Sequence, residues 1–186
     1  PGAPRLVVLA PTRELALQIM GVIKGLAHHR KLRVRLLDAG SKGRSALAAG
    51  PLDVLVAVPG KLVGCLKRKE LSLSNIRALV LDEADQLLDA GFKKELENIF
   101  QSCPRTPEGR PLAQVVLVSA TMPATAVEFR NKLFKSVPFL DLALDQAHHV
   151  PHFVETFNIY LSAKEKTSMA REFLAREAEG EGIIFM

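Results

Sequence analysis

An acidic tetrad, Asp82-Glu83-Ala84-Asp85, follows a short apolar run at 78–81 that is typical of a buried β-strand. Carboxylates at the carboxyl end of a strand can hold a hydrated Mg²⁺ ion and orient a water molecule for phosphoryl transfer. Asp82 comes first after the run and suits the metal, through water, whereas Glu83 is placed to polarise an attacking water. The tetrad alone leaves a second interpretation open, in which Asp82 or Asp85 is a helix N-cap.

Three further polar segments follow apolar runs in the same way. Two of them open helical patterns, and because helix N-termini present free N–H groups and partial positive charge, they suit phosphate binding. Arg13 adds a forked donor to the first segment. On these residues alone, an N-cap at Thr12 with a solvated Arg13 is the more common explanation of the first segment. A capped turn before the helix at Pro123 is the corresponding alternative for the third segment. The three segments are Pro11-Thr12-Arg13, Pro59-Gly60-Lys61 and Ser119-Ala120-Thr121.

The elements that must position these segments alternate along the chain as strand and helix. This alternation predicts an α/β fold with a parallel sheet whose strands are covered on both faces. Since the carboxyl ends of parallel strands share one edge, we expect the polar segments to lie together there. Strands are predicted at 5–10, 34–37, 53–58, 76–81, 114–118 and 139–144, and helices at 12–28, 45–49, 60–69, 84–88, 93–100 and 124–133.

The remainder of the chain predicts a break and a second domain. Three prolines and a glycine at 103–111 indicate a surface loop, and the polar segment 145–152 indicates a linker. After the linker come an alternating run to residue 161, a helix at 164–177 and an apolar run at 183–186, a pattern typical of a further βαβ unit. The chain starts at Pro1 without an initiator Met and stops inside an apolar run, so we expect it to be a piece of a larger protein.

Composition excludes several classes of protein. The 186 residues are 48% apolar, which excludes a disordered tail, and no apolar run reaches the roughly 18 residues of a transmembrane helix, so no membrane association is expected. Two cysteines, Cys65 and Cys103, cannot build a disulfide scaffold or a four-cysteine zinc site. They predict reduced thiols in an intracellular protein, with the choice of nucleus, cytoplasm or organelle left open.

Charge is distributed unevenly along the chain. Residues 1–75 hold 13 Lys/Arg and 4 Asp/Glu, a balance of +9, whereas residues 76–186 hold 12 and 16, a balance of −4. A basic half favours a polyanionic partner such as nucleic acid. A solvated basic surface is the alternative on charge alone.

Taken together, the polar segments resemble the DEAD-box ATP-dependent RNA helicases of superfamily 2. Their motifs Ia, Ib, II and III are matched, in order and with ordinary spacing, by PTRELA at 11–16, VPGK at 58–61, DEAD at 82–85 and SAT at 119–121. The resemblance covers essentially the whole chain. It implies a RecA-like parallel sheet flanked by helices, with partial helicase core domain 1 at 1–144, the interdomain linker at 145–152 and the beginning of core domain 2 at 153–186.

The resemblance also implies cofactors, partners and residue roles. ATP and Mg²⁺ would be bound with the help of Asp82 and Glu83, and Glu83 would activate the attacking water. Ser119 and Thr121 would hydrogen-bond the carboxylate of Asp85 and link hydrolysis to strand separation. Single-stranded or duplex RNA would be held by its sugar-phosphate backbone, with little base specificity. The residues implied in RNA binding are Pro11, Thr12, Arg13, Gly40, Pro59, Gly60 and Lys61.

Some positions depart from the family's pattern. Ala39-Gly40 stands where the family has Gly-Gly, and Val58 and Lys61 replace the Thr and Arg of its Thr-Pro-Gly-Arg motif. The phosphate-binding Gly-x-x-x-x-Gly-Lys-Ser/Thr loop, which precedes motif Ia in the family, does not occur in the chain. We therefore expect the sheet to be truncated at its N-terminal side, without the strand that feeds this loop.

These observations predict a fragment of an ATP-dependent RNA helicase that couples ATP hydrolysis to RNA binding and local duplex unwinding. The chain alone is expected to be inactive. One alternative is a non-catalytic RNA-binding or ribonucleoprotein-assembly factor that retains the helicase fold. A DNA-directed helicase of the same superfamily is a third, which the full DEAD spelling disfavours.

Overall fold

The computed structural model describes residues 2–27, 30–37, 50–134, 137–142, 160, 162 and 164–176. Contacts divide the chain into two units, residues 1–147 and 148–186, and helix α7 (Lys166–Arg176) belongs to the second. The predicted domain limits near 144 and 153, the predicted helix at 45–49, the predicted linker and the predicted strand at 183–186 lie outside the described residues.

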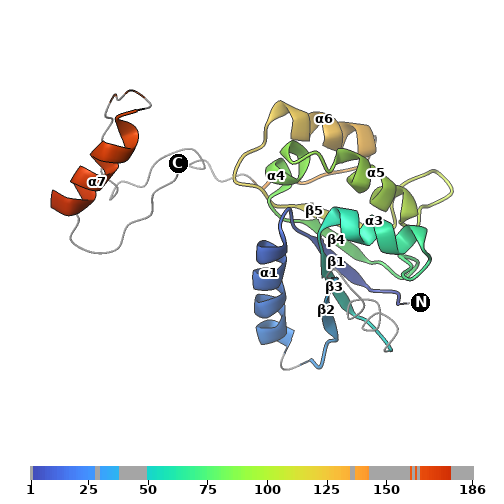
Figure 1. Cartoon of the computed structure of the whole chain (residues 1–186). Helices are drawn as coiled ribbons and strands as arrows, with labels where there is room; N and C mark the ends of the chain where they lie inside the picture. Colours follow the sequence, from blue (N-terminus) through green and yellow to red (C-terminus); the bar gives the residue numbers. More distant parts are fainter. Residues whose placement is uncertain are drawn as a thin grey trace. The chain divides into compact units, whose positions relative to one another are not determined.

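Five parallel strands form the sheet of the first unit, in the order β2-β3-β1-β4-β5 (Figure 1). The strands start in one row, since Leu6 of β1 lies opposite Val54 of β3 and Ala78 of β4. The α/β class with a parallel sheet flanked by helices is therefore confirmed. The strands are β1 (Leu6–Leu9), β2 (Val34–Leu37), β3 (Val54–Ala57), β4 (Ala78–Leu81) and β5 (Gln114–Leu117).

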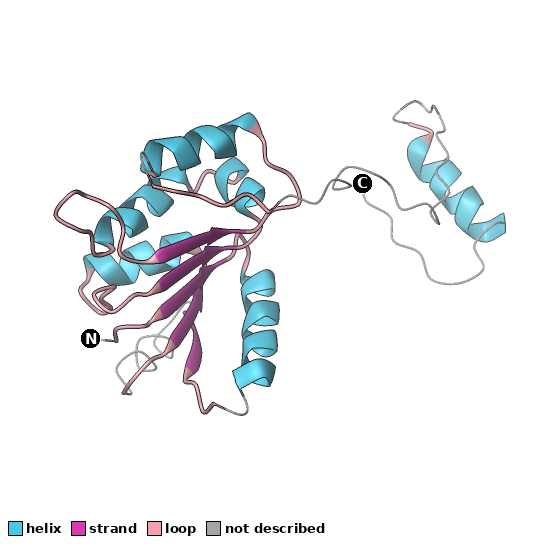
Figure 2. Ribbon diagram, turned by 180° about the vertical axis from the view of Figure 1, so that it is seen from behind, coloured by secondary structure: helices cyan, strands magenta, loops and turns pink. Residues whose placement is uncertain are grey.

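Helices cover the two faces of the sheet unequally. On one face, α1 packs over β2 and β3, with Ala16 of the helix buried against Val8 and Val56 of the strands (Figure 2). The other face carries the larger core and the other described helices of the unit. The helices are α1 (Arg13–Leu26), α3 (Pro59–Lys67), α4 (Ala84–Asp89), α5 (Lys93–Ser102) and α6 (Ala124–Leu133).

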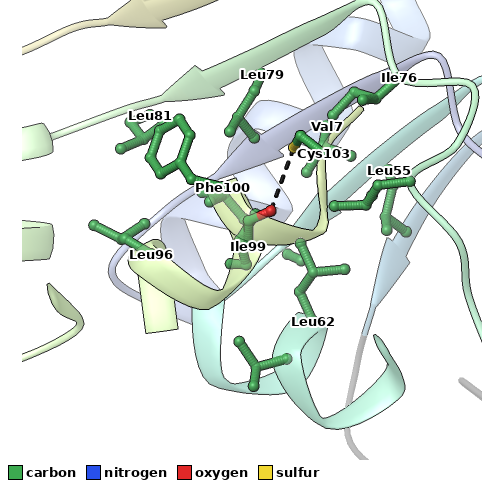
Figure 3. Packing of buried hydrophobic residues seen from close by; sticks show 14 of the residues in the cluster. Val7, Leu55, Leu62, Ile76, Leu79, Leu81, Leu96, Ile99, Phe100 and Cys103 are labelled. Atoms are coloured by element: carbon green, nitrogen blue, oxygen red, sulfur yellow. Dashed lines mark hydrogen bonds between the residues drawn. The ribbon is translucent and has the colours of Figure 1, made fainter. Parts of the chain in front are cut away.

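Phe100 of α5 belongs to the larger core, beside Leu81 and Leu96 (Figure 3). Its ring meets those of Phe129 and Phe134 edge to face, with centroids 6.4 and 5.2 Å away. One turn on, the thiol of Cys103 donates to the carbonyl oxygen of Ile99 at 3.3 Å. Burial raises the pKa of Cys103 to about 11, so this thiol stays protonated and packs as an apolar side chain.

Strand β5 departs from the prediction that every strand is covered on both faces. Val116 is 37% exposed and Val118, just after the strand, is 48% exposed, while Val115 and Leu117 pack on the larger core. The physical reason is the reach of α1, which covers β2 and β3 and leaves the same face of β5 bare. Beyond β4, β5 has no strand partner among the described residues, so its backbone forms a sheet edge.

Substitution of Val116 by lysine is expected to lower self-association of the chain. An apolar sheet edge promotes strand pairing between copies, and a charge on that edge opposes it. Light-scattering mass measured over a range of protein concentrations would show the difference. The matched control is Val22→Lys, which places the same charge on an equally apolar, 64% exposed position of α1. Equal self-association of the two variants would contradict this role for the edge.

The predicted strand at 139–144 is wrong over residues 139–142. These residues have no regular structure, and Leu140 and Leu142 are 79% and 82% exposed. An apolar run forms a strand only where a neighbour completes its ladder, and none does so here among the described residues. Phe139 instead packs under the guanidinium of Arg130, 4.1 Å from the ring centroid. None of the described helices has the length and apolar character needed to cross a membrane.

Candidate active site

The four polar segments that follow strands meet at one edge of the sheet. Backbone hydrogen bonds place them there, from Asp82 N–H to the Leu9 oxygen at 2.9 Å and from Ala84 N–H to the Val118 oxygen at 3.0 Å. Ala10 N–H likewise bonds the Ala57 oxygen at 3.1 Å. We call this the carboxyl edge, and it comprises residues 10–14, 58–61, 82–85 and 118–123.

Glu83 has a left-handed backbone at the start of α4, with φ 50° and ψ 55°. A residue other than glycine in this region costs about 1–3 kcal/mol, and such residues cluster at functional sites. The cost is offset by hydrogen bonds on either side, from Glu83 N–H to Asp82 Oδ1 at 3.0 Å and from Ala84 N–H to Val118. Glu83 is the N-cap residue but its side chain makes no capping bond, so its half-buried carboxylate is available for chemistry.

Asp82 is half-buried directly after β4. Its Oδ1 accepts from Glu83 N–H, which fixes the carboxylate, whereas Oδ2 has no hydrogen-bond partner among the described residues. No three described His, Cys, Asp or Glu side chains lie close enough to hold a metal ion by themselves. Mg²⁺ keeps several waters and takes only one or two carboxylates beside substrate phosphates, so a single, oriented Asp82 fits that ion.

The capping alternative for the tetrad does not describe either aspartate. The N-cap of α4 is Glu83, and Asp85 lies one residue inside the helix. The Asp85 carboxylate accepts from Gln86 N–H at 2.9 Å through Oδ1 and from the hydroxyl of Thr121 through Oδ2. Asp85 is therefore a link between α4 and the segment after β5.

Thr121 and Ser119 contact Asp85 in different ways. The Thr121 hydroxyl donates to the carboxylate, as the sequence leads us to expect. Ser119 Oγ accepts from the backbone N–H of Asp85 at 3.3 Å, a main-chain contact in addition to its effect on the carboxyl. The Thr121 hydroxyl, aided by Ser119 and by the N–H of Gln86, holds the pKa of the Asp85 carboxyl below its usual 3.8.

Thr121→Val is expected to raise the pKa of Asp85 toward its ordinary value. In the wild-type fold the depressed pKa adds stability that is fully present above pH 3.8 and is lost as the pH falls through the folded-state pKa. The variant should therefore lose less stability over that acid range. A pH titration of the Asp85 carboxyl ¹³C shift tests this, with Thr125→Val as the control because Thr125 is exposed in the first turn of α6. An unchanged Asp85 titration in Thr121→Val would refute the assignment.

Helix α1 starts at the carboxyl edge. Thr12 is its N-cap, and its Oγ1 accepts from Leu15 N–H at 3.2 Å, so the capping interpretation of Thr12 is confirmed. Pro11 is buried, and Arg13 is an exposed side chain of the first turn. Capping engages one lone pair of the Thr12 hydroxyl and leaves its proton and the neighbouring N–H groups directed out of the helix start.

Helix α3 starts at the same edge. Pro59 is its first residue and is buried, while Gly60 and Lys61 are exposed. A Cβ on Gly60 would meet nothing within 4 Å, and its backbone has an ordinary helical φ. Nothing within the described chain therefore requires glycine at this position. Gly40, which the resemblance implies in RNA binding, lies outside the described residues.

Comparison with known proteins places this arrangement in a family. Residues 1–129 match the DEAD/DEAH box helicase family. The chain belongs to the DEAD-box helicases. It is 39% identical over 135 residues to a protein named ATP-dependent RNA helicase eIF4A from Kluyveromyces lactis, covering 72% of this chain and 33% of that one.

Other relatives extend the similarity of this DEAD-box chain. It is 42% identical over 135 residues to eukaryotic initiation factor 4A-1 of Arabidopsis thaliana, covering 71% of this chain and 31% of the relative. A maize protein named DEAD-box ATP-dependent RNA helicase 3B, chloroplastic, is 34% identical over 180 residues, which is 95% of this chain and 23% of the relative. The DEAD-box chain thus spans about a third or less of the length of these relatives.

The sequence does not predict two features of the DEAD-box site. One is the left-handed backbone of Glu83, which no glycine or asparagine signals. The other is the Ser119 contact with the Asp85 amide, since a hydroxyl beside a carboxylate suggests a side-chain bond first. Both depend on the exact juxtaposition of β4 and β5, which residue types do not specify.

Proposed function

We propose that the protein containing this chain is an ATP-dependent RNA helicase, which couples ATP hydrolysis to RNA binding and local duplex opening. The observation that carries the proposal is the bond between the Thr121 hydroxyl and the Asp85 carboxylate, which joins two neighbouring strand ends. Because the bond ties the carboxylate segment to the segment that leads into α6, we propose that it couples the two. Relatives named as ATP-dependent RNA helicases support the same reaction.

In the proposed reaction, Asp82 would hold a hydrated Mg²⁺ ion, with its carboxylate oriented by the Glu83 N–H. That ion would neutralise phosphate charge. Glu83 orients and polarises the attacking water, and its side chain is not engaged in capping α4. The Glu83 N–H bond holds the Asp82 carboxylate and leaves the Glu83 carboxylate uninvolved.

The RNA-binding half of the proposal uses the helix starts. Pro11, Thr12 and Arg13 begin α1, and Pro59, Gly60 and Lys61 begin α3, so two sets of N–H groups face one edge. The open space above Gly60 allows a sugar-phosphate backbone to approach the main chain. We propose that single-stranded or duplex RNA binds to these residues through its sugar-phosphate backbone. Gly40 is proposed to contribute to the same binding.

We further propose that the 186 residues alone do not hydrolyse ATP. No Gly-x-x-x-x-Gly-Lys-Ser/Thr loop occurs among them, and such a loop cradles nucleotide phosphates. On this proposal, residues 1–144 are a partial nucleotide-binding core, 145–152 a linker and 153–186 the beginning of a second core domain. The buried, protonated thiol of Cys103 fits the intracellular setting proposed for the protein.

A second candidate is a non-catalytic RNA-binding or assembly factor. Val58 and Lys61 favour it, since the first lacks a hydroxyl and the second lacks a guanidinium fork that would strengthen a backbone grip. The test is phosphate release by the natural full-length protein, measured with RNA and with DNA of matched length. Stimulation by RNA supports the helicase. RNA binding without phosphate release favours the assembly factor, and equal stimulation by DNA favours a DNA-directed enzyme.

A further inference from the structure

Basic side chains gather at the end of the sheet where the strands begin. We call this the amino edge, and it comprises the described residues 2–5, 24–27, 30–33, 50–53, 67–77 and 103–113. It holds eleven Lys/Arg and three Asp/Glu, whereas the carboxyl edge holds two and four. The basic character of the first part of the chain therefore belongs mostly to the edge opposite the candidate active site.

Backbone hydrogen bonds place the strand starts of the amino edge in one continuous row. Asp53 N–H bonds the Arg33 oxygen at 3.1 Å, and Arg5 N–H bonds the Asp53 oxygen at 2.9 Å. Arg77 N–H in turn bonds the Arg5 oxygen at 2.8 Å. Each of these residues stands one position before its strand, and neighbouring strands lie about 4.8 Å apart, so the four side chains share one face of the sheet.

The helix ends add to this row. Gly2 pairs with Leu71, which brings the basic residues just after α3 beside the start of the chain. Lys24 is in the last turn of α1, whose connection to β2 carries Arg30 and Lys31. Figure 2 shows the helix ends and the strand starts on the same side of the sheet as the N-terminus.

Internal pairing leaves much of this charge uncompensated. Arg33 forms a forked pair with Asp53, at 2.8 Å from Nε to Oδ2 and 3.4 Å from Nη2 to Oδ1. Arg68 forms a second forked pair with Glu70. Arg5 and Arg77 lie directly opposite each other and exposed, and no described side chain forms an ion pair with Arg77. Arg33, through its hydrogen bonds, and Arg5, through its charge, lower the pKa of the Asp53 carboxyl, so one carboxylate serves two arginines. Like charges opposite each other destabilise a sheet, and Arg77 has no described acidic partner that would offset this.

Helix dipoles explain only part of the pattern. Lys24 and Lys67 stand in the last turns of α1 and α3, where a cation is favourable. Arg5 and Arg77 stand one residue before strands and belong to the last turn of no helix. An external phosphate would account for arginine at these two positions, because a guanidinium fork binds phosphate oxygens in pairs.

We propose that the amino edge is a second RNA-binding surface, which contacts phosphates of RNA that extends beyond the carboxyl edge. The inference rests on the proposed function only in taking RNA as the polyanion. Helix α1 runs from one edge to the other, and its 14 residues span about 21 Å. At 3.4 Å per nucleotide along one strand, an RNA needs about six more nucleotides than the carboxyl edge holds in order to reach both.

The experiment measures RNA affinity of the natural full-length protein at several KCl concentrations, with a short RNA and with one long enough to reach both edges. The amino-edge variant is Arg5→Gln/Arg77→Gln, and Lys31→Gln/Lys69→Gln repeats the test at residues without side-chain partners among those described. The matched control is Lys93→Gln/Lys94→Gln, which removes the same charge from exposed residues outside both edges. Melting temperatures verify that all variants fold.

Both amino-edge variants are expected to bind the long RNA more weakly and to lower its salt slope by about 1.4, or 0.7 per lost phosphate contact. Their affinity for the short RNA should match the control. If the amino-edge variants bind long RNA with the same affinity and salt slope as the control, the inference is overturned. Binding of poly-glutamate, measured alongside, identifies the other outcome: a loss of poly-glutamate binding with unchanged RNA binding would assign the edge to an acidic protein.

Phosphate release separates this inference from the proposed function. RNA-stimulated release with unaltered long-RNA binding by the amino-edge variants means that the inference alone fails. If the amino-edge variants bind long RNA more weakly but the wild type shows no RNA-stimulated phosphate release, the proposed function alone fails. Absence of any RNA binding by the wild type overturns both.

Discussion

Glu83→Gln in the natural full-length protein is expected to lower RNA-stimulated phosphate release by about 10²–10⁴-fold, the usual contribution of a positioned general base. Glutamine keeps the size of the side chain but cannot polarise water as a carboxylate does. The backbone N–H of residue 83 still bonds Asp82, so the neighbouring carboxylate keeps its orientation. The loss should therefore appear in kcat, with RNA affinity little changed.

The control for this prediction is Glu95→Gln. Glu95 is a half-buried carboxylate in the first turn of α5, outside the carboxyl edge, and its amide variant should retain full activity. Phosphate release that survives Glu83→Gln undiminished would remove Glu83 from the catalytic role. Equal losses in both variants would indicate a general effect of removing acidic charge instead.

Phe100→Ala is expected to lower the free energy of unfolding of the chain by about 3–5 kcal/mol. Phe100 is 2% exposed, and its truncation removes both edge-to-face ring contacts and leaves a cavity between α5 and α6. A domain of this size is stable by only about 5–15 kcal/mol, so much of the fold's stability depends on this ring. Urea denaturation followed by circular dichroism, at concentrations below those of self-association, measures the change.

Two companion variants keep this prediction testable. Phe100→Leu retains most of the volume and should lose about 1 kcal/mol, chiefly the aromatic contacts. Phe173→Ala, at a 54% exposed site of α7, should change stability by no more than about 0.5 kcal/mol. A Phe100→Ala midpoint no lower than that of Phe173→Ala would show that the aromatic cluster does not hold this face together.

Continuous apolar runs and helix signals were sufficient to predict most elements of the first unit. The run before Asp82 became β4, and the Thr12 and Pro59 signals mark the true starts of α1 and α3. The same reasoning failed at 139–142, because an apolar run does not reveal whether a partner strand stands beside it. It also failed for the cover of β5, since α1 packs on β2 and β3, which β1 and β4 separate from β5.

The sequence by itself determined which residues reach the carboxyl edge, because strand ends are local and parallel strands share their direction. Residues 82–85 and 119–121 therefore had to lie near each other once the elements alternated. Only the tertiary structure decided how they meet. The left-handed Glu83, the Ser119 bond to the Asp85 amide and the row of Arg33, Asp53, Arg5 and Arg77 depend on strand order and register. Strand order and register arise from long-range backbone pairing, which no local pattern of residue types specifies.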